Sequence, residues 1–285
     1  MSSVVLKLIA VITMLIDHAA ASCFHIWGLY GIEVPLLDMN LYWFCRLIGR
    51  IAFPIYCFLI VEGVHYTRDW KKYALRLGAL ALLSELPFDF CLHGLQINLG
   101  RPDVFGQLMD GLDWKHQNVF FTLLLGMLCV QFLKAGRQLL TGYWAGKKDR
   151  TVPDRIRFLL FTVLRYASWI AVTLGLAWVA EHVLCTDYGN GGVIMISIMG
   201  LIDEYWEDVA AWLPKWLIRT AICALALWTC CQVLNNEFEM WGMIALLPIA
   251  LYNGKKGYSN KVLQYGFYLF YPVHLVVLGI IKMIG

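Results

Sequence analysis

An acidic side chain and an imidazole stand next to each other inside the first apolar stretch of the chain. Asp17 and His18 lie in the run from about residue 4 to residue 30. An ionisable group at the centre of a bilayer costs at least ~2.5–3.5 kcal/mol, so such residues indicate a functional site. Histidine titrates near neutral pH and can act as a general base. The pair predicts a reactive site within the membrane; a purely structural pair is the alternative.

A lysine shares a helix face with this histidine. Lys7 precedes His18 by eleven residues, so the two differ by roughly 20° around a helix and by ~16 Å along it. We therefore expect both side chains to line one polar tunnel. A signal peptide is the alternative for this N-terminal run, but its apolar region would be purely apolar and only about 7–15 residues long.

Other polar side chains are predicted at the same depth on different helices. Arg46 and Arg50 lie one turn apart in the second apolar run, and Arg50 is too deep to reach the surface cheaply. We expect Glu85 or Glu62 to pair with Arg50, because a lone buried guanidinium is costly; a pair that only locks helices is the structural alternative. The groups predicted at one depth are Asp17, His18, Arg50, Glu85 and His274. Together they predict a polar cavity inside a helix bundle.

The composition places these residues in a membrane protein. The chain is 60% hydrophobic and 15% charged, and its successive apolar runs approach the ~20 residues that cross a bilayer. It predicts an all-α, polytopic integral membrane helical bundle that forms a single domain over residues 1–285, and it excludes a soluble protein. About nine transmembrane helices are expected at residues 4–30, 41–64, 73–92, 118–136, 158–184, 189–202, 216–233, 238–252 and 262–283. The short sixth and eighth spans could be re-entrant or end early.

The distribution of positive charge predicts the orientation. More than half of the 23 Lys and Arg residues fall in the segments Arg68–Arg76, Lys134–Arg157 and Lys255–Lys261. The positive-inside rule places these segments in the cytoplasm, so we expect a multi-pass plasma-membrane protein with a cytoplasmic N-terminus and an outer C-terminus. The residues expected in outer loops are Glu33, Asp38, Asp103, Asp110 and Asp113. Charge confined to loops also excludes a nucleic-acid partner.

The nine cysteines indicate packing rather than metal binding. Most lie inside apolar runs, where they act as small apolar side chains. The chain has no C-x-x-C motif and no Cys/His spacing suited to zinc, so we expect no metal. Cys91 and Cys185 fall near the predicted outer face and could form a disulfide.

Ordered sequence blocks over nearly the whole chain resemble the TraX family. The blocks are Lys7-x-x-Ala10-x-x-x-Met14-x-x-Asp17-His18, Gly49-Arg50-Ile51-Ala52-Phe53-Pro54, Phe58-Leu59-Ile60-Val61-Glu62-Gly63, Tyr73-x-x-Arg76-Leu77, Ser84-Glu85-x-Pro87-Phe88-Asp89, Asn118-Val119-x-x-Thr122-Leu123-x-x-Gly126, Asp187-Tyr188-Gly189 and Tyr271-Pro272-x-His274-Leu275. The blocks are specific as an ordered set, whereas each one alone is weak.

This resemblance implies an acyl-transfer enzyme. Founding TraX proteins acetylate the N-terminus of conjugative pilin, and the family is distantly similar to acyltransferase-3 proteins and heparan-α-glucosaminide N-acetyltransferase. Those enzymes use a histidine in the first span, often with a basic or polar residue eleven positions before it, and Lys7 and His18 match that spacing. The implied co-substrate is cytoplasmic acetyl-CoA, an acyl-CoA. The implied acceptor carries a hydroxyl or amine at or beyond the outer membrane face: a pilin N-terminus, a surface glycan or a small molecule.

The resemblance also implies roles for individual residues. His18 would be the general base, oriented by Asp17 or by a carboxylate from another helix. Lys7, Arg50 and Arg76 would hold acyl-CoA, while Arg50 or Tyr271 could stabilise the charge that develops on the thioester oxygen. The residues expected around the acceptor are Arg46, Glu62, Glu85, Asn118, Tyr271 and His274.

The depth of the last span gives the sharpest geometric expectation. Tyr271 and His274 should face His18 across the cavity, with His274 within ~12 Å of His18, because packed helix axes lie 8–10 Å apart. A bond from His274 to a main-chain carbonyl next to Pro272 is the alternative. A secondary transporter or proton-coupled flippase would use the same polar residues, although no inverted repeat is visible. A non-catalytic assembly factor is a third possibility.

Overall fold

The computed structural model describes residues 1–35, 38–93, 106–107, 113, 115–145, 151–202, 213–258 and 260–285. Regular structure in this part of the chain is helical, apart from the short antiparallel strands β1 (Glu33–Val34) and β2 (Met39–Asn40). The predicted all-α fold is confirmed. Asp103 and Asp110, expected in an outer loop, lie outside the described residues.

The helices lie in the predicted apolar runs, but several limits differ: the first helix ends at Cys23 rather than at residue 30, and the helix that begins at Val119 continues to Ala145 rather than to residue 136. In chain order they are α1 (Ser3–Cys23), α2 (Leu41–Gly49), α3 (Ala52–Tyr66), α4 (Trp70–Leu92), α6 (Val119–Ala145), α7 (Val152–His182), α8 (Gly189–Met199), α10 (Lys215–Leu234), the 3-10 helix η1 (Glu237–Ala245), α11 (Leu246–Ala250) and α12 (Lys261–Ile284).

Six of the described helical segments are long and apolar enough to cross a membrane. They are α1, Leu41–Tyr66 (α2 with α3), α6, α7, α10 and α12. With 11 residues, α8 rises only about 16 Å, half of a ~30 Å hydrocarbon core. The eighth predicted span is instead η1 followed by the five residues of α11. The multi-pass character is confirmed, and the count of nine spans stays a prediction.

The centre of the bundle is α3. Its residues Ile55, Cys57 and Phe58 are fully buried in a cluster shared with α1, α6, α8 and α10. A helix that is hydrophobic on all sides can face either lipid or other helices. In this structure the other helices of the bundle cover α3.

The second predicted span is interrupted between α2 and α3. Arg50 is the C-cap of α2, and α3 begins at Ala52. Pro54 is the third residue of α3, a position whose amide has no intrahelical partner in any helix. The interruption leaves Arg50 at a helix junction that faces α1.

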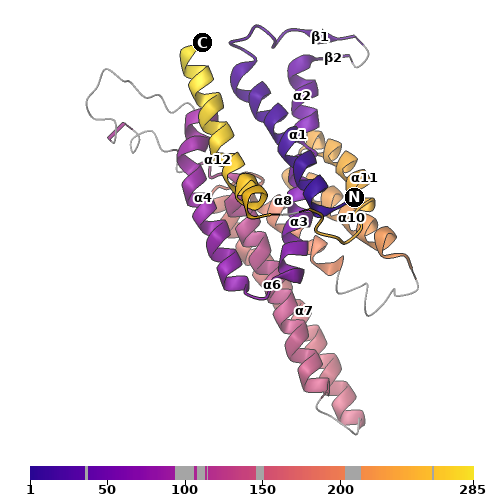
Figure 1. The fold of residues 1–285 in the computed structure, drawn as a ribbon. Helices are drawn as coiled ribbons and strands as arrows, with labels where there is room; N and C mark the ends of the chain where they lie inside the picture. Colours follow the sequence, from indigo (N-terminus) through magenta and orange to yellow (C-terminus); the bar gives the residue numbers. More distant parts are fainter. Residues whose placement is uncertain are drawn as a thin grey trace.

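The two terminal helices lie beside each other. α12 packs against α1 and α4, and α1 also packs against α2 (Figure 1). The start of α1 is bonded to the segment that precedes α12: the Ser3 amide donates to the Lys255 carbonyl at 2.9 Å, and the Asn253 amide donates to the Met1 carbonyl at 2.9 Å. Residues far apart in the sequence are thereby joined at one end of the bundle.

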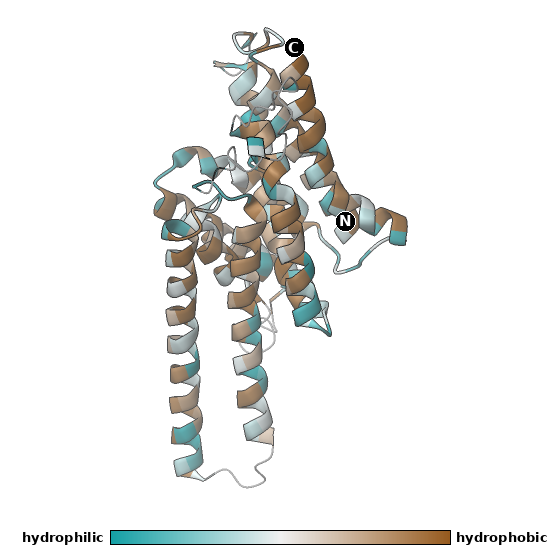
Figure 2. Cartoon of the chain, turned by 90° about the vertical axis from the view of Figure 1, so that its left-hand side faces the viewer, coloured by the Kyte–Doolittle hydropathy of each residue, from teal (hydrophilic) through white to brown (hydrophobic). Residues whose placement is uncertain are grey.

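A long hairpin formed by α6 and α7 extends beyond the other helices (Figure 1). Hydrophobic residues run along both of its helices (Figure 2). Within the most apolar stretch of 18 residues in α7, only 11% of the residues are buried by other parts of the protein. The hairpin is anchored to the bundle by Lys134, whose ammonium donates to the Val64 carbonyl at 2.6 Å and so satisfies the C-terminal end of α3.

Candidate functional site

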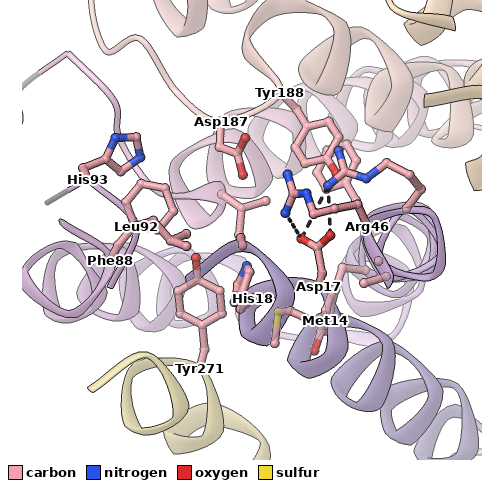
Figure 3. A pocket seen from close by; sticks show the side chains of 17 residues that line it. Met14, Asp17, His18, Arg46, Phe88, Leu92, His93, Asp187, Tyr188 and Tyr271 are labelled. Carbon is pink, nitrogen blue, oxygen red and sulfur yellow. Dashed lines mark hydrogen bonds and ion pairs between the residues drawn. The ribbon is translucent and has the colours of Figure 1, made fainter. Parts of the chain in front are cut away.

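A cavity of about 300 Å³ lies among α1, α2, α3, α4 and α12 and is closed by the segment that joins α7 to α8. Charged side chains form one wall, and an imidazole with aromatic rings forms the other (Figure 3). Asp17, His18 and Arg50 line it, as the sequence predicted. Because Tyr271 lines the cavity as well, the structure brings together residues more than 250 positions apart.

The two histidines expected at one depth are in direct contact. His18 Nδ1 lies 2.7 Å from His274 Nε2, and the ring planes differ by only 3°. His274 Nδ1 lies 2.8 Å from the main-chain carbonyl oxygen of Phe270. The prediction that His274 faces His18 is confirmed. The bond to a carbonyl near Pro272, which was the alternative, is present as well.

These contacts fix which ring atoms carry protons. A carbonyl oxygen only accepts, so His274 Nδ1 carries a hydrogen and donates it to Phe270. In a neutral imidazole the other nitrogen is then an acceptor, so His274 Nε2 accepts from His18 Nδ1. His18 Nε2 is left with a lone pair and no hydrogen-bond partner among the described residues. A base with a defined free lone pair results.

Asp17 does not orient this ring. Its oxygen Oδ2 accepts from Arg46 at 2.7 Å, and its two oxygens lie 3.4 Å from Arg50. His274 takes the place next to His18 that was expected for a carboxylate. The reason is geometric, since adjacent helix residues point about 100° apart.

Arg50 bridges two acidic residues from distant elements. Its Nη1 lies 2.6 Å from Glu239 in η1, and its Nη2 lies 3.4 Å from Asp17. The expectation that Glu85 or Glu62 would be its partner is wrong. Because a largely buried guanidinium with two carboxylates is well compensated, this cluster holds α1, α2 and η1 together beside the cavity.

A glycine permits the approach of α1 and α2 at this point. A Cβ atom on Gly49 would overlap the carboxyl group of Asp17. The ion pairs from Asp17 to the arginines of α2 therefore require the smallest residue at position 49.

Comparison with known proteins agrees with the resemblance seen in the sequence. The family described as TraX protein matches residues 2–282. The chain belongs to the TraX family. It is also 26% identical over 283 residues to the probable fimbrial assembly protein FimC, serogroup H1, of Dichelobacter nodosus, which covers 98% of this chain and 94% of that protein. No solved structure matches the chain.

One TraX sequence block closes the cavity, although its residues were not predicted as site residues. Asp187 and Tyr188 line the cavity in the segment between α7 and α8. Tyr188 has a left-handed backbone with φ of 64°, a conformation that is costly for a bulky residue and that indicates a functional constraint. The sequence feature that could have identified these residues is the Asp187-Tyr188-Gly189 block itself. The block lies between two predicted spans, so its depth in the membrane was not predicted.

Asp187 is held by bonds from its main chain. Its amide donates to the Gln117 carbonyl at 2.8 Å, and its carbonyl accepts from the Thr122 hydroxyl. The side chain is open to the cavity but surrounded by protein, and this burial raises the pKa of Asp187 to about 6. Arg50 and Arg46 act in the opposite direction on this pKa. A proton acceptor that titrates near neutral pH therefore faces the cavity.

Lys7 lines a separate cavity. This second cavity, of about 390 Å³, lies toward the N-terminal end of α1 and includes Glu62, Tyr252 and Lys256. Lys7 faces the Phe267 ring of α12 at 5.7 Å, so Lys7 and His18 do share the α12 side of α1. The prediction that both line one tunnel is wrong for the described structure: α3 lines the first cavity with Tyr56 and the second with Leu59, about one turn further along.

Four predicted site residues line neither cavity: Arg76, Glu85, Asn118 and His274, the last of which contacts His18. The buried Glu85 accepts from the Asn118 side chain, which also donates to the Ala81 carbonyl at 2.8 Å. These bonds join α4 to the start of α6. Arg76 is exposed and donates to the Lys72 carbonyl at 3.1 Å. Glu62, by contrast, lines the second cavity and accepts from the Tyr252 hydroxyl at 2.9 Å.

Tyr271 occupies the position expected for it. It lines the first cavity, and its ring meets that of His18 edge-on with centroids 6.0 Å apart. Its hydroxyl points into the cavity (Figure 3). The proposed disulfide is not formed, because Cys91 and Cys185 are both free thiols.

Proposed function

We propose that this TraX-family protein is an integral membrane acyltransferase that moves an acetyl group from acetyl-CoA to an amine or hydroxyl. The observation that best supports this proposal is the contact of His18 Nδ1 with His274, which leaves His18 Nε2 free among the described residues. A base of this kind can take a proton from an acceptor group. A fimbrial assembly protein among the relatives supports the N-terminal amine of a pilin as the first acceptor to test.

In the proposed step the acceptor nitrogen or oxygen attacks the carbonyl carbon of the thioester. The acceptor's proton moves to His18 Nε2 while the new C–N or C–O bond forms. The C–S bond then breaks, and the leaving thiolate of CoA takes the proton back from His18. The base returns to its starting state, so no external proton donor is needed.

Negative charge that develops on the thioester oxygen requires a donor. The Tyr271 hydroxyl lies beside the His18 ring and points into the cavity, which suits this role. Arg46 and Arg50 present N–H donors on the opposite wall, where Asp17 and Glu239 balance their charges. Their ion pairs with acidic residues hold them in place, and a fixed cation costs no reorganisation during the reaction.

The second cavity is the proposed place for the phosphates of acyl-CoA. Lys7 and Lys256 supply two ammonium groups there, about 16 Å along α1 from His18. The pantetheine arm would reach the first cavity only through a passage that opens between Leu59 of the second cavity and Tyr56 of the first. In this arrangement the N-terminal end of the bundle faces the cytoplasm of a plasma membrane, and the acceptor enters from the opposite face.

The test uses the purified full-length protein in detergent with labelled acetyl-CoA and a synthetic pilin N-terminal peptide. We expect the peptide to gain the mass of one acetyl group. His18→Ala should lower the rate by about 10²–10⁴-fold, the usual contribution of a general base. His25→Ala, a change at an exposed histidine just after α1, is the matched control.

Two outcomes would contradict the proposal. An unmodified peptide and intact acetyl-CoA over long incubation would argue against transfer. Equal rates for wild type and His18→Ala would remove His18 from the chemistry. A transporter would instead carry its substrate across a vesicle membrane and leave the mass of the substrate unchanged.

A further inference from the structure

A second group of ligand-type side chains lies at the rim of the first cavity. His93, Asp113 and His116 each offer one donor atom, and these atoms lie within 4.8 Å of one another. His93 also lines the cavity that holds His18 and stands at the side away from Asp17 (Figure 3). The acyl-transfer step described above uses none of the three.

The distances suit a single metal ion. Asp113 Oδ2 lies 2.7 Å from His116 Nδ1 and 3.8 Å from His93 Nδ1. Ligand atoms on a tetrahedral zinc ion, with bonds of 2.0–2.1 Å, lie about 3.3 Å apart. The two observed distances lie on either side of this value. Small rotations of the side chains would therefore bring all three atoms to one ion.

Hydrogen bonds to neighbouring residues hold two of these ligands in place. The Asp113 amide donates to the fully buried Asp89 at 2.9 Å, and the His93 amide donates to the Asp89 carbonyl at 3.1 Å. Asp113 Oδ1 accepts from the Lys115 amide at 3.0 Å, which leaves Oδ2 toward the histidines. The bond from the Lys115 amide acts on the ligand carboxylate itself, and such bonds orient the ligands of metal sites.

We propose that His93, Asp113 and His116 form a zinc site. Two imidazoles and one carboxylate are a known three-ligand set for Zn²⁺ and leave a fourth position for water or a substrate oxygen. The ligand side chains are 26%, 32% and 61% exposed, in the same order, so an ion can enter from solvent. Bound zinc would tie the end of α4 to the start of α6 at the cavity rim.

This site departs from the sequence expectation of no metal. That expectation rested on the spacing of cysteines and histidines along the chain. The proposed ligands are two histidines and one aspartate, and they come from two segments about twenty residues apart. The proposal is independent of acyl transfer, since neither His18 nor acetyl-CoA takes part. The competing interpretation is a hydrogen-bonded His116–Asp113 pair, beside His93, that binds no metal.

The experiment measures metal binding by the full-length protein, purified in detergent with a tag that contains no histidine. After treatment with EDTA, Zn²⁺ is titrated by calorimetry, and Co²⁺ is followed by its visible absorption. We expect one equivalent of either ion, with a tetrahedral cobalt spectrum that lacks thiolate charge-transfer bands. Thiolate bands would assign the binding to cysteine and overturn the proposal.

Variants locate the ion. His116→Ala and Asp113→Asn should each weaken zinc binding by more than about tenfold, because a three-ligand site loses one ligand. His25→Ala should bind like wild type. Thermal unfolding of the metal-free proteins shows that each variant folds, and zinc should raise the unfolding temperature of wild type but not of His116→Ala. Unchanged binding in the His93→Ala/His116→Ala double variant, or no binding by wild type, would overturn the proposal.

Discussion

The imidazole pair ends on a main-chain carbonyl rather than on a carboxylate. In a Ser-His-Asp triad the third member is an acidic side chain that fixes the tautomer and adds a negative charge. Here Phe270 fixes the tautomer of His274, and His274 fixes that of His18, without any net charge. The direction of the lone pair on His18 therefore depends on the backbone of α12.

Replacing the second imidazole tests this dependence. His274→Ala should lower acyl transfer by about 10²–10⁴-fold, since His18 then loses both its partner and its fixed tautomer. His274→Gln should recover part of the rate, because a side-chain carbonyl can accept from His18 Nδ1. Initial rates with acetyl-CoA, together with thermal unfolding, measure both effects. A wild-type rate in His274→Ala would exclude a positioning role.

The arginines of α2 should affect stability unequally. Arg50→Ala leaves Asp17 and Glu239 without this partner, and loss of one member of a buried pair costs about 3–5 kcal/mol. Arg46→Ala should cost less, because its side chain is 24% exposed compared with 12% for Arg50. Chemical unfolding in detergent measures the difference. An Arg50→Ala protein that unfolds like wild type but is inactive would instead indicate contact with a substrate.

The sequence predicts the members of this site better than their partners. Counting residues from the ends of apolar runs gives depth, and depth alone places His18, Tyr271 and His274 together. It gives no direction around each helix, so the sequence predicts Glu85 or Glu62 as the partner of Arg50. Its actual partners are Asp17 and Glu239, and Glu239 lies at the start of a segment predicted to be an ordinary membrane span.

At the scale of elements, the connection between α7 and α8 is the least regular part of the cavity. Tyr188 stacks on Phe53 of α3 with ring centroids 3.5 Å apart, and both Tyr188 and Gly189 have positive φ. This packing holds the preceding Asp187 against the cavity. A helix at this position would carry the carboxyl group away from the arginines.

Asp187 should make stability depend on pH. Its pKa in the folded protein is about 6, raised from 3.8 by burial, so the folded state binds this proton more tightly than the unfolded chain does. The resulting stabilisation is complete below about pH 4 and is lost as pH rises through 6. The unfolding temperature of wild type, compared with that of Asp187→Asn, should therefore fall between pH 4 and 6. Parallel curves for the two proteins would contradict this assignment.

Element boundaries follow from physical signals that the sequence contains. Asn40 and Asn260 cap α2 and α12 with their side chains, and both helices begin within one residue of the predicted limits. The break at Arg50 and Ile51 lies between Gly49 and Pro54; the sequence predicts a kink at Pro54 within one continuous span, and the structure places the interruption before that proline. The 3-10 geometry of η1 was missed because its composition is apolar throughout.

At the scale of the whole molecule, charge distribution and fold predict one orientation. The α6–α7 hairpin projects from the end of the bundle opposite to the C-terminus (Figure 1), and basic residues are concentrated in the segment that contains its tip. Leu139 on the hairpin and Ile284 near the C-terminus are each 77% exposed, so they form a matched pair of labelling sites.

Cysteine labelling tests the orientation. In a Cys185→Ser background, a membrane-impermeant maleimide should label Ile284→Cys in intact cells and Leu139→Cys only after the membrane is opened. Background labelling should be low, because the other eight cysteines are buried. Labelling of both positions from the same side would contradict the predicted topology.

The bond between the chain start and the segment before α12 also sets a length. From this joint, α1 runs fifteen residues to His18, about 22 Å along its axis. α12 begins six residues after Lys255 and contains Pro272 before His274, so its residues do not add up along one straight axis. The length of α1 therefore sets the height of His18, and α12 brings His274 to the same height. One residue inserted into α1 above the joint would lift His18 by about 1.5 Å and turn it by about 100°. Such an insertion would separate the pair while every residue of the cavity was still present.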